Sequence, residues 1–221
     1  ELKAVCQKHG VTLNVAVQFA VHKLLQTYTG DAQTIIGTTV SGRDVDGIDR
    51  IENSVGLFIN TLPLCVNWEG SVIDMLKQIQ VNLVDLNSNS KVSLADIQRV
   101  AGCHGHERLF QILLVFENYP AGTSRTGIAG NMRILGAKEK TDYPLTLLAY
   151  EIGTELVLGL RYDKKLISSK QARRLLDQIQ SILSCLCSPD MEISLLSDAE
   201  RDLLLNEYGP GDIVSFDTTK T

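Results

Sequence analysis

Residues 55–66 read VGLFINTLPLCV, and they follow the polar stretch TTVSGRDVDGIDRIENS at 38–54. Apolar residues nearly alternate with others along the run, which predicts a half-buried extended segment. The apolar set is Val55, Leu57, Ile59, Leu62, Leu64 and Val66. Asn60 and Thr61 interrupt it, and a buried amide or hydroxyl without a partner costs about 1–3 kcal/mol. Two interpretations stay open: a hydrogen-bonded structural turn before Pro63, or a wall of a ligand channel.

The residues before this run predict a helix followed by a strand. Thr12 is a suitable N-cap for a helix that ends near Thr29, with Gly30 just beyond it. The segment LNVAVQFAVHKLL is apolar on nearly every side, which indicates a helix buried between layers. Residues 33–40 then favour a strand, and residues 41–54 a polar loop.

The rest of the chain mixes helices and strands without strict alternation. We expect helices at 71–86, 93–100 and 168–187, strands at 110–118 and around 132–137, and a hairpin of strands at 145–152 and 155–162. The continuous apolar run FQILLVFEN is typical of a sheet covered on both faces. These elements predict a layered α/β sandwich with a mixed sheet. After residue 188 the pattern is that of a tail with one small helix at 198–207.

Composition narrows the class of protein. The 221 residues carry a net charge of −5 without a cluster of basic residues, which argues against a nucleic-acid partner. No apolar run reaches the roughly 18 residues that span a bilayer, and the N-terminus lacks a secretory pattern. Five cysteines without a C-x-x-C pair predict reduced thiols in the cytoplasm. Because the chain opens on Glu1 inside a helical pattern, we expect a piece of a longer protein.

The run at 55–66 resembles the IGFFVNTLPLRV-type motif of condensation domains in nonribosomal peptide synthetases. Further matching segments follow in the family's order, from His9 to about Tyr208, and include SLADIQRVAG, LFQILLVFENYP, TDYPLTLLAYEIGTELVLGLRYD and ISLLSDAERDLLLNEYG. The resemblance implies a chloramphenicol-acetyltransferase-like layered sandwich. It implies that residues 1–188 are the C-terminal subdomain of a condensation domain and that 189–221 are a linker leading towards an adenylation domain.

The resemblance also implies a reaction and its partners. Condensation domains join an acyl or peptidyl thioester to an aminoacyl thioester through an amide bond, and both substrates hang on phosphopantetheine arms of upstream and downstream carrier proteins. The family's catalytic HHxxxDG motif is absent from this sequence. We therefore expect no catalytic residue and no directly bound cofactor here, and no activity without the N-terminal half of the domain. Two alternatives stay open: a heterocyclisation domain, and a degenerate module that docks carrier proteins without catalysis.

The resemblance singles out six residues as suspected parts of a substrate tunnel. Gly56, Phe58, Asn60 and Thr61 match the motif position by position, and Ser41 and Arg43 belong to a Ser-Gly-Arg turn upstream. Ser41 could bond an acceptor amine or be a plain turn serine, and Arg43 more simply pairs with a carboxylate across the loop. The family's latch to the N-terminal half would correspond to residues 111–140.

Other chemistry finds little support in the sequence. The segment CHGHE at 103–107 offers few metal ligands and no second cluster, so we expect no metal site. His22 lies within the apolar helix and is expected to be a hydrogen-bonded core residue or a boundary residue, not a base. No G-x-S-x-G elbow and no phosphate-binding loop is present, which argues against a free-standing hydrolase and a nucleotide-binding protein.

Overall fold

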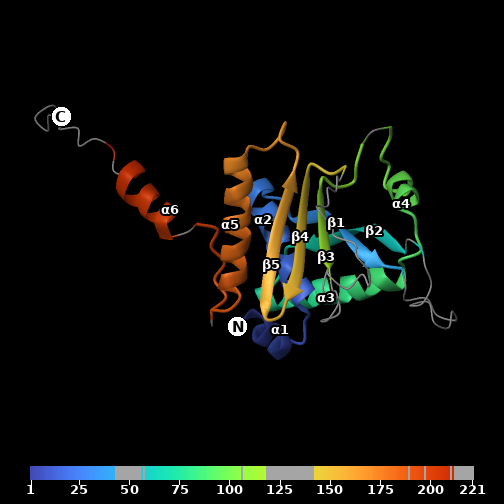
Figure 1. Cartoon of the computed structure of the whole chain (residues 1–221), viewed down its shortest axis with the longest axis horizontal. Coiled ribbons are helices and arrows are strands. Elements are labelled where there is room, and N and C mark those ends of the chain that lie inside the picture. Colours follow the sequence, from blue (N-terminus) through green and yellow to red (C-terminus); the bar gives the residue numbers. More distant parts are fainter. Residues whose placement is uncertain are drawn as a thin grey trace, which may run out of the picture.

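The computed structural model describes residues 1–42, 56, 58–105, 107–117, 142–188, 190–196, 198–209 and 211. The helices are α1 (Leu2–His9), α2 (Leu13–Thr29), α3 (Val72–Ser88), α4 (Leu94–Val100), α5 (Ser169–Cys185) and α6 (Asp198–Asp202), which continues as a π-helical turn, η2 (Leu203–Tyr208). The strands are β1 (Gln33–Ser41), β2 (Ile59–Asn67), β3 (Ile112–Glu117), β4 (Leu145–Ile152) and β5 (Glu155–Tyr162) (Figure 1). The predicted strand at 132–137 and most of the predicted latch lie outside the described residues.

The sheet is mixed, as predicted. Its strand order is β2-β1-β3-β4-β5; β1 runs parallel to β3 and β3 to β4, while the two outer pairs are antiparallel. One row of residues crosses all five strands: Pro63, Gly37, Leu113, Thr146 and Arg161. This arrangement confirms the layered α/β sandwich of the chloramphenicol-acetyltransferase type.

Strand β2 is an edge strand, and its outward backbone groups are bonded by side chains. Thr61 N donates to Asn60 Oδ1, Asn82 Nδ2 donates to Cys65 O, and Asn67 N donates to Gln78 Oε1. Pro63 alternates with the same period as Thr61, Cys65 and Asn67, so its backbone nitrogen also points away from β1. The N–H that proline lacks is therefore not needed for a hydrogen bond between β1 and β2. Side chains from α3 thus cover an edge that would otherwise be open to pairing.

Helix α2 lies in the core, as its uniform apolarity predicts. It is capped by Thr12, whose hydroxyl accepts from Val15 N, and it ends at Gly30 with a left-handed φ of 74°. It packs against β1, α3 and α5. Both α3 and α5 begin with a capping box, Ser71 with Asp74 and Ser168 with Gln171. The predicted start of each helix is confirmed to within a residue.

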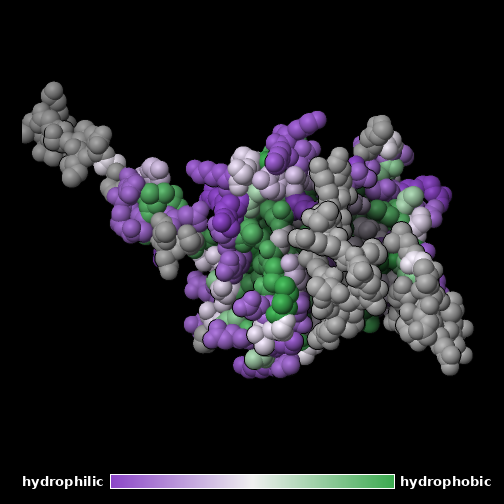
Figure 2. Space-filling view, in the orientation of Figure 1, coloured by the Kyte–Doolittle hydropathy of each residue, from purple (hydrophilic) through white to green (hydrophobic). Residues whose placement is uncertain are grey.

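Within the described residues, α2, α3 and α5 pack against one face of the sheet. Leu114 and Leu147 point into the core beneath these helices, so their neighbours Leu113 and Leu148 point to the opposite side. We call this opposite side the open face. In Figure 1, α2 lies behind β4 and β5, and Figure 2 shows hydrophobic residues gathered over these two strands on the side turned to the viewer. The apolar run at 110–118 is expected to be covered on both faces; helices of the described residues cover one of them, and Leu113 is buried on the other face as well.

Candidate functional site

The side chains of β2 alternate between the helix layer and the open face. Leu62, Leu64 and Val66 are buried against the helices, so Asn60 shares their side. Ile59 and Thr61 therefore belong to the open face, and Ile59 is 63% exposed. Ile59 belongs to the apolar set of the predicted half-buried segment, but it lies on the opposite side from Leu62, Leu64 and Val66, because two residues instead of one separate positions 59 and 62. Val55 and Leu57 lie outside the described residues.

Asn60 is fully engaged with the backbone around it. Its Nδ2 donates to Ser90 O and to Val92 O, each at 2.8 Å, and its Oδ1 accepts from Thr61 N at 2.8 Å. The residue lies within a regular strand, paired with Val40. The predicted turn before Pro63 is therefore wrong, although the predicted need for hydrogen-bond partners is met. The partners come from the α3–α4 connection, which lies about thirty residues away in the chain.

The remaining motif residues gather at the same end of the β1–β2 ladder. Gly42 N donates to Phe58 O at 2.9 Å and extends the pairing beyond Ser41 and Ile59. A side chain at Gly42 would place its Cβ 2.2 Å from Phe58 O, so the close approach of these two segments requires glycine. Gly56 lies against the Phe58 ring, from which an added Cβ would be 3.2 Å away. The structure thus brings Ser41, Gly56, Phe58, Asn60 and Thr61 together, while Arg43 lies outside the described residues.

Thr39 is a candidate that the sequence did not single out. It pairs with Thr61 across the ladder, and both are half-buried residues of the open face. Two hydroxyls therefore stand side by side on the open face. Side chains alternate along β1, and Ile36, Thr38 and Val40 are buried on the helix side. This alternation alone predicts that the Thr39 side chain projects to the open face.

An aromatic stack covers the centre of β1 on the open face. The Phe110 ring lies where a side chain of Gly37 would be, since an added Cβ would come within 2.1 Å of it. Phe110 stacks on Tyr143 with ring centroids 5.3 Å apart and 18° between planes. The Arg108 guanidinium lies 5.5 Å from the Tyr143 ring and donates to the backbone carbonyl of Asp142. Burial raises the pKa of the Tyr143 hydroxyl.

A buried polar cluster joins α2 to β1 on the helix side. Gln18 Nε2 donates to Thr38 Oγ1 at 2.6 Å, and His22 Nδ1 lies 2.8 Å from Thr34 Oγ1. Trp68 Nε1 also donates to Thr34 Oγ1, at 3.0 Å. His22 is fully buried, and this burial lowers the pKa of its imidazole to about 3. The prediction of a hydrogen-bonded core histidine is confirmed, and His22 lies on the side of β1 away from the open face.

The described residues hold no group of three or more metal-ligating side chains. They also include no helix long and apolar enough to cross a membrane. All five cysteines are described, and none forms a disulfide. The chemistry that this arrangement offers is that of a wall: an apolar sheet face bordered by the motif residues, with hydroxyls at Thr39 and Thr61.

Comparison with known proteins assigns the chain to a family. The family model named Condensation domain matches residues 1–205. The chain belongs to the condensation-domain family. It is 37% identical over 221 residues to a linear gramicidin synthase of Brevibacillus parabrevis, covering 96% of this chain and 4% of that protein. It is 35% identical to N-(5-amino-5-carboxypentanoyl)-L-cysteinyl-D-valine synthase of Amycolatopsis lactamdurans, covering 90% of this chain and 6% of that protein.

Solved structures agree with the fold of this condensation-domain chain. It superposes on a four-domain nonribosomal peptide synthetase with a TM-score of 0.75 at 19% identity, covering 90% of this chain and 17% of that one. On the first condensation domain of the CDA synthetase the TM-score is 0.68 at 19% identity, covering 89% of this chain and 45% of that one. The chain therefore spans less than half of these solved chains and a few per cent of the curated relatives.

Proposed function

We propose that this chain is the C-terminal subdomain of a condensation domain in a nonribosomal peptide synthetase. Residues 1–188 form the subdomain, and 189–221 are a linker towards an adenylation domain. The observation that carries the proposal is the position of the motif. Ser41, Phe58 and Thr61 meet at the border of an apolar sheet face against which no helix of the described residues packs. A partner layer on that face would enclose the motif at the boundary between two halves.

The reaction is amide formation between two thioesters held on carrier proteins. The amine of an aminoacyl thioester attacks the carbonyl of an acyl or peptidyl thioester, the carbon–sulfur bond breaks, and the thiol of the upstream phosphopantetheine arm leaves. The proton lost by the amine needs a base, which we assign to the histidine motif of the N-terminal half. The present chain supplies positioning, which alone can account for a large part of such a barrier.

The roles proposed within the chain follow from the side on which each residue lies. Thr61 faces the substrate side of the wall, with Ser41, Gly56 and Phe58 at its end. Arg43 remains a proposed member of the same turn. Phosphopantetheine belongs to the carrier proteins, and this chain binds no cofactor of its own in the proposal. A cytoplasmic location, expected from the odd number of reduced cysteines, belongs to the same proposal.

Reconstitution of amide formation tests the proposal. Loaded upstream and downstream carrier proteins are mixed with this chain, with the chain plus a separately expressed N-terminal half, and with the continuous domain. We expect no amide product above a carrier-only control from the chain alone, and product from the continuous domain. Turnover by the isolated 221 residues would contradict the half-domain assignment. A continuous domain with an intact histidine motif that binds carriers but forms no amide would favour the docking module.

A further inference from the structure

The Asn60 side chain ties the edge strand to the connection between α3 and α4. One amide group makes three hydrogen bonds of 2.8 Å, two as donor to Ser90 O and Val92 O and one as acceptor from Thr61 N. Both amide hydrogens are therefore used within the protein. The side chain also lies on the helix side of β2, away from the open face. A direct hydrogen bond from this amide to a substrate on the open face is incompatible with these contacts.

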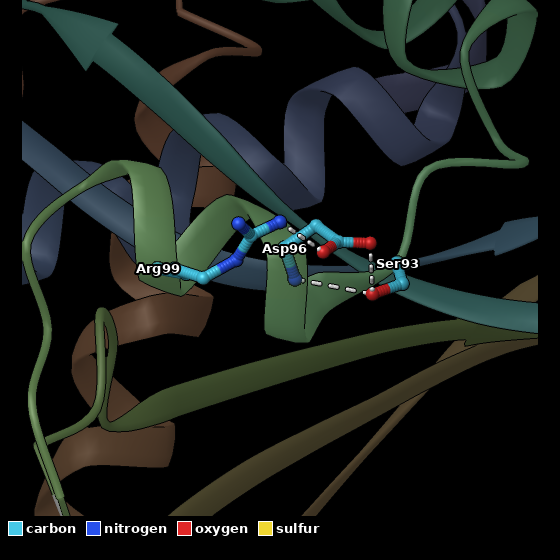
Figure 3. Close-up of polar contacts among 3 residues, drawn as sticks. All are labelled: Ser93, Asp96 and Arg99. Atoms are coloured by element: carbon cyan, nitrogen blue, oxygen red, sulfur yellow. Dashed lines mark hydrogen bonds and ion pairs between the residues drawn. The ribbon is translucent and has the colours of Figure 1, made fainter.

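The connection that Asn60 holds leads directly into α4. Ser90 is buried, and Val92 is followed by Ser93, the N-cap of α4. Figure 3 shows how the first turn of this helix is fixed: Asp96 N donates to Ser93 Oγ at 3.1 Å, and Arg99 pairs with the Asp96 carboxylate at 2.7 Å. Helix α4 in turn contacts β2. Asn60 thus joins the segment that leads into the first turn of α4 to strand β2.

The other neighbours of Asn60 belong to the proposed substrate wall. Ile59 and Thr61 flank it in sequence and project to the opposite side of β2, and Thr61 lies beside Thr39. The backbone of Thr61 is held by Asn60 Oδ1 itself. A shift of Asn60 would therefore displace the two wall residues next to it.

We propose that Asn60 is a positioning residue, whose amide locks the α3–α4 connection onto β2 and so holds Ile59 and Thr61 in place on the open face. This inference rests on the proposed function. The site calls for an amide, because two carbonyl oxygens need donors while one backbone N–H needs an acceptor at the same place. An aspartate supplies the acceptor alone and puts a carboxylate against two carbonyl oxygens.

The chain offers a matched control on the same strand. Asn82 Nδ2, at a partly exposed position on α3, donates at 3.0 Å to Cys65 O of β2, four residues along the strand from Thr61. In the continuous domain, we compare Asn60→Ala and Asn60→Asp with Asn82→Ala, well below the unfolding temperature. We expect kcat for amide formation to fall about 10- to 100-fold in both Asn60 variants, with KM for the carrier-bound substrates within about twofold, because misplaced reactants mainly affect the chemical step. Asn82→Ala should keep kcat within about twofold.

Hydrogen exchange provides a readout that does not depend on activity. Asn60→Ala should increase exchange at the Thr61 amide and in α4, Asn60→Asp should do so in α4 while the Thr61 amide stays protected, and Asn82→Ala should change neither. Wild-type kcat in Asn60→Ala, unchanged exchange in α4, or an equal loss of kcat in Asn82→Ala would overturn the inference. A wild-type domain that forms no amide would instead count against the proposed function, while the exchange pattern would still decide whether Asn60 positions α4.

Discussion

Acid should destabilise this chain through His22. The imidazole is fully buried, and burial lowers its pKa to about 3, whereas an imidazole in an unfolded chain has a pKa of about 6.5. Between pH 6.5 and about pH 3 the His22 imidazole is therefore protonated in the unfolded state and neutral in the folded state. The stabilising contribution is complete above pH 6.5 and is lost progressively as the pH falls from 6.5 towards 3.

The size of the loss follows from the gap between the two pKa values. Each pH unit between them is worth about 1.4 kcal/mol, so the free energy of unfolding should fall by about 2 kcal/mol between pH 7 and pH 5. By pH 3 the loss from this residue reaches about 4 kcal/mol, which is of the order of the whole stability of a typical domain. Among the described residues, no carboxylate raises the pKa of His22 against the effect of burial: the ring faces Thr34, and the Trp68 indole and Lys23 lie beyond.

Urea unfolding at pH 8, 7, 6 and 5 measures this effect. His22→Asn keeps an amide that can bond Thr34 but does not titrate, so it should be less stable at pH 8 and should lose about 2 kcal/mol less between pH 7 and pH 5 than the wild type. His104→Gln, at an exposed position, serves as the control and should follow the wild-type curve. If His22→Asn has the same pH dependence as the wild type over this range, the proposed role of the buried imidazole is refuted.

Three further predictions concern packing and caps. Gly37→Ala should lower the free energy of unfolding by about 1–3 kcal/mol in denaturant titrations, since its Cβ would meet the Phe110 ring. Phe110→Ala removes this ring, so the double variant should lose less stability in total than the two single variants lose when their losses are added. Ser71→Ala and Ser168→Ala should each cost about 1 kcal/mol by removing a capping box, whereas Ser184→Ala, within α5, should change the unfolding midpoint little. Ile59→Ser should leave the stability of this chain within about 0.5 kcal/mol, because the side chain is 63% exposed, but should weaken association with the N-terminal half in a binding titration.

Local signals made most of the helices and strands predictable. Thr12 and Gly30 bound α2, Ser71 and Ser168 begin α3 and α5, and Gly153-Thr154 closes the β4–β5 hairpin, all as expected. In each case the residues that fix the boundary lie within a few positions of it. Their chemistry can therefore be deduced without knowledge of the rest of the fold.

The features that escaped prediction depend on residues far apart in the chain. The stack of Phe110 on Gly37 joins β1 to the segment before β3, and nothing near either residue in the sequence shows which side of β1 the ring covers. The partners of Asn60 are carbonyls about thirty residues away. Backbone carbonyls carry no sequence signature, so an amide that needs them can be predicted to need partners but not to find these particular ones.

The Asn-Thr pair explains why a structural and a channel interpretation of the motif both fit its sequence. In a strand, adjacent residues project to opposite sides, so one member of the pair can serve the scaffold while the other faces the open side. Asn60 bonds the α3–α4 connection on the helix side, and Thr61 stands beside Thr39 on the open face. Asn60 therefore has the structural role, and the channel role that we propose falls to Thr61. Because Asn60 Oδ1 also holds Thr61 N, the two roles depend on each other, and a substitution at either position should affect both.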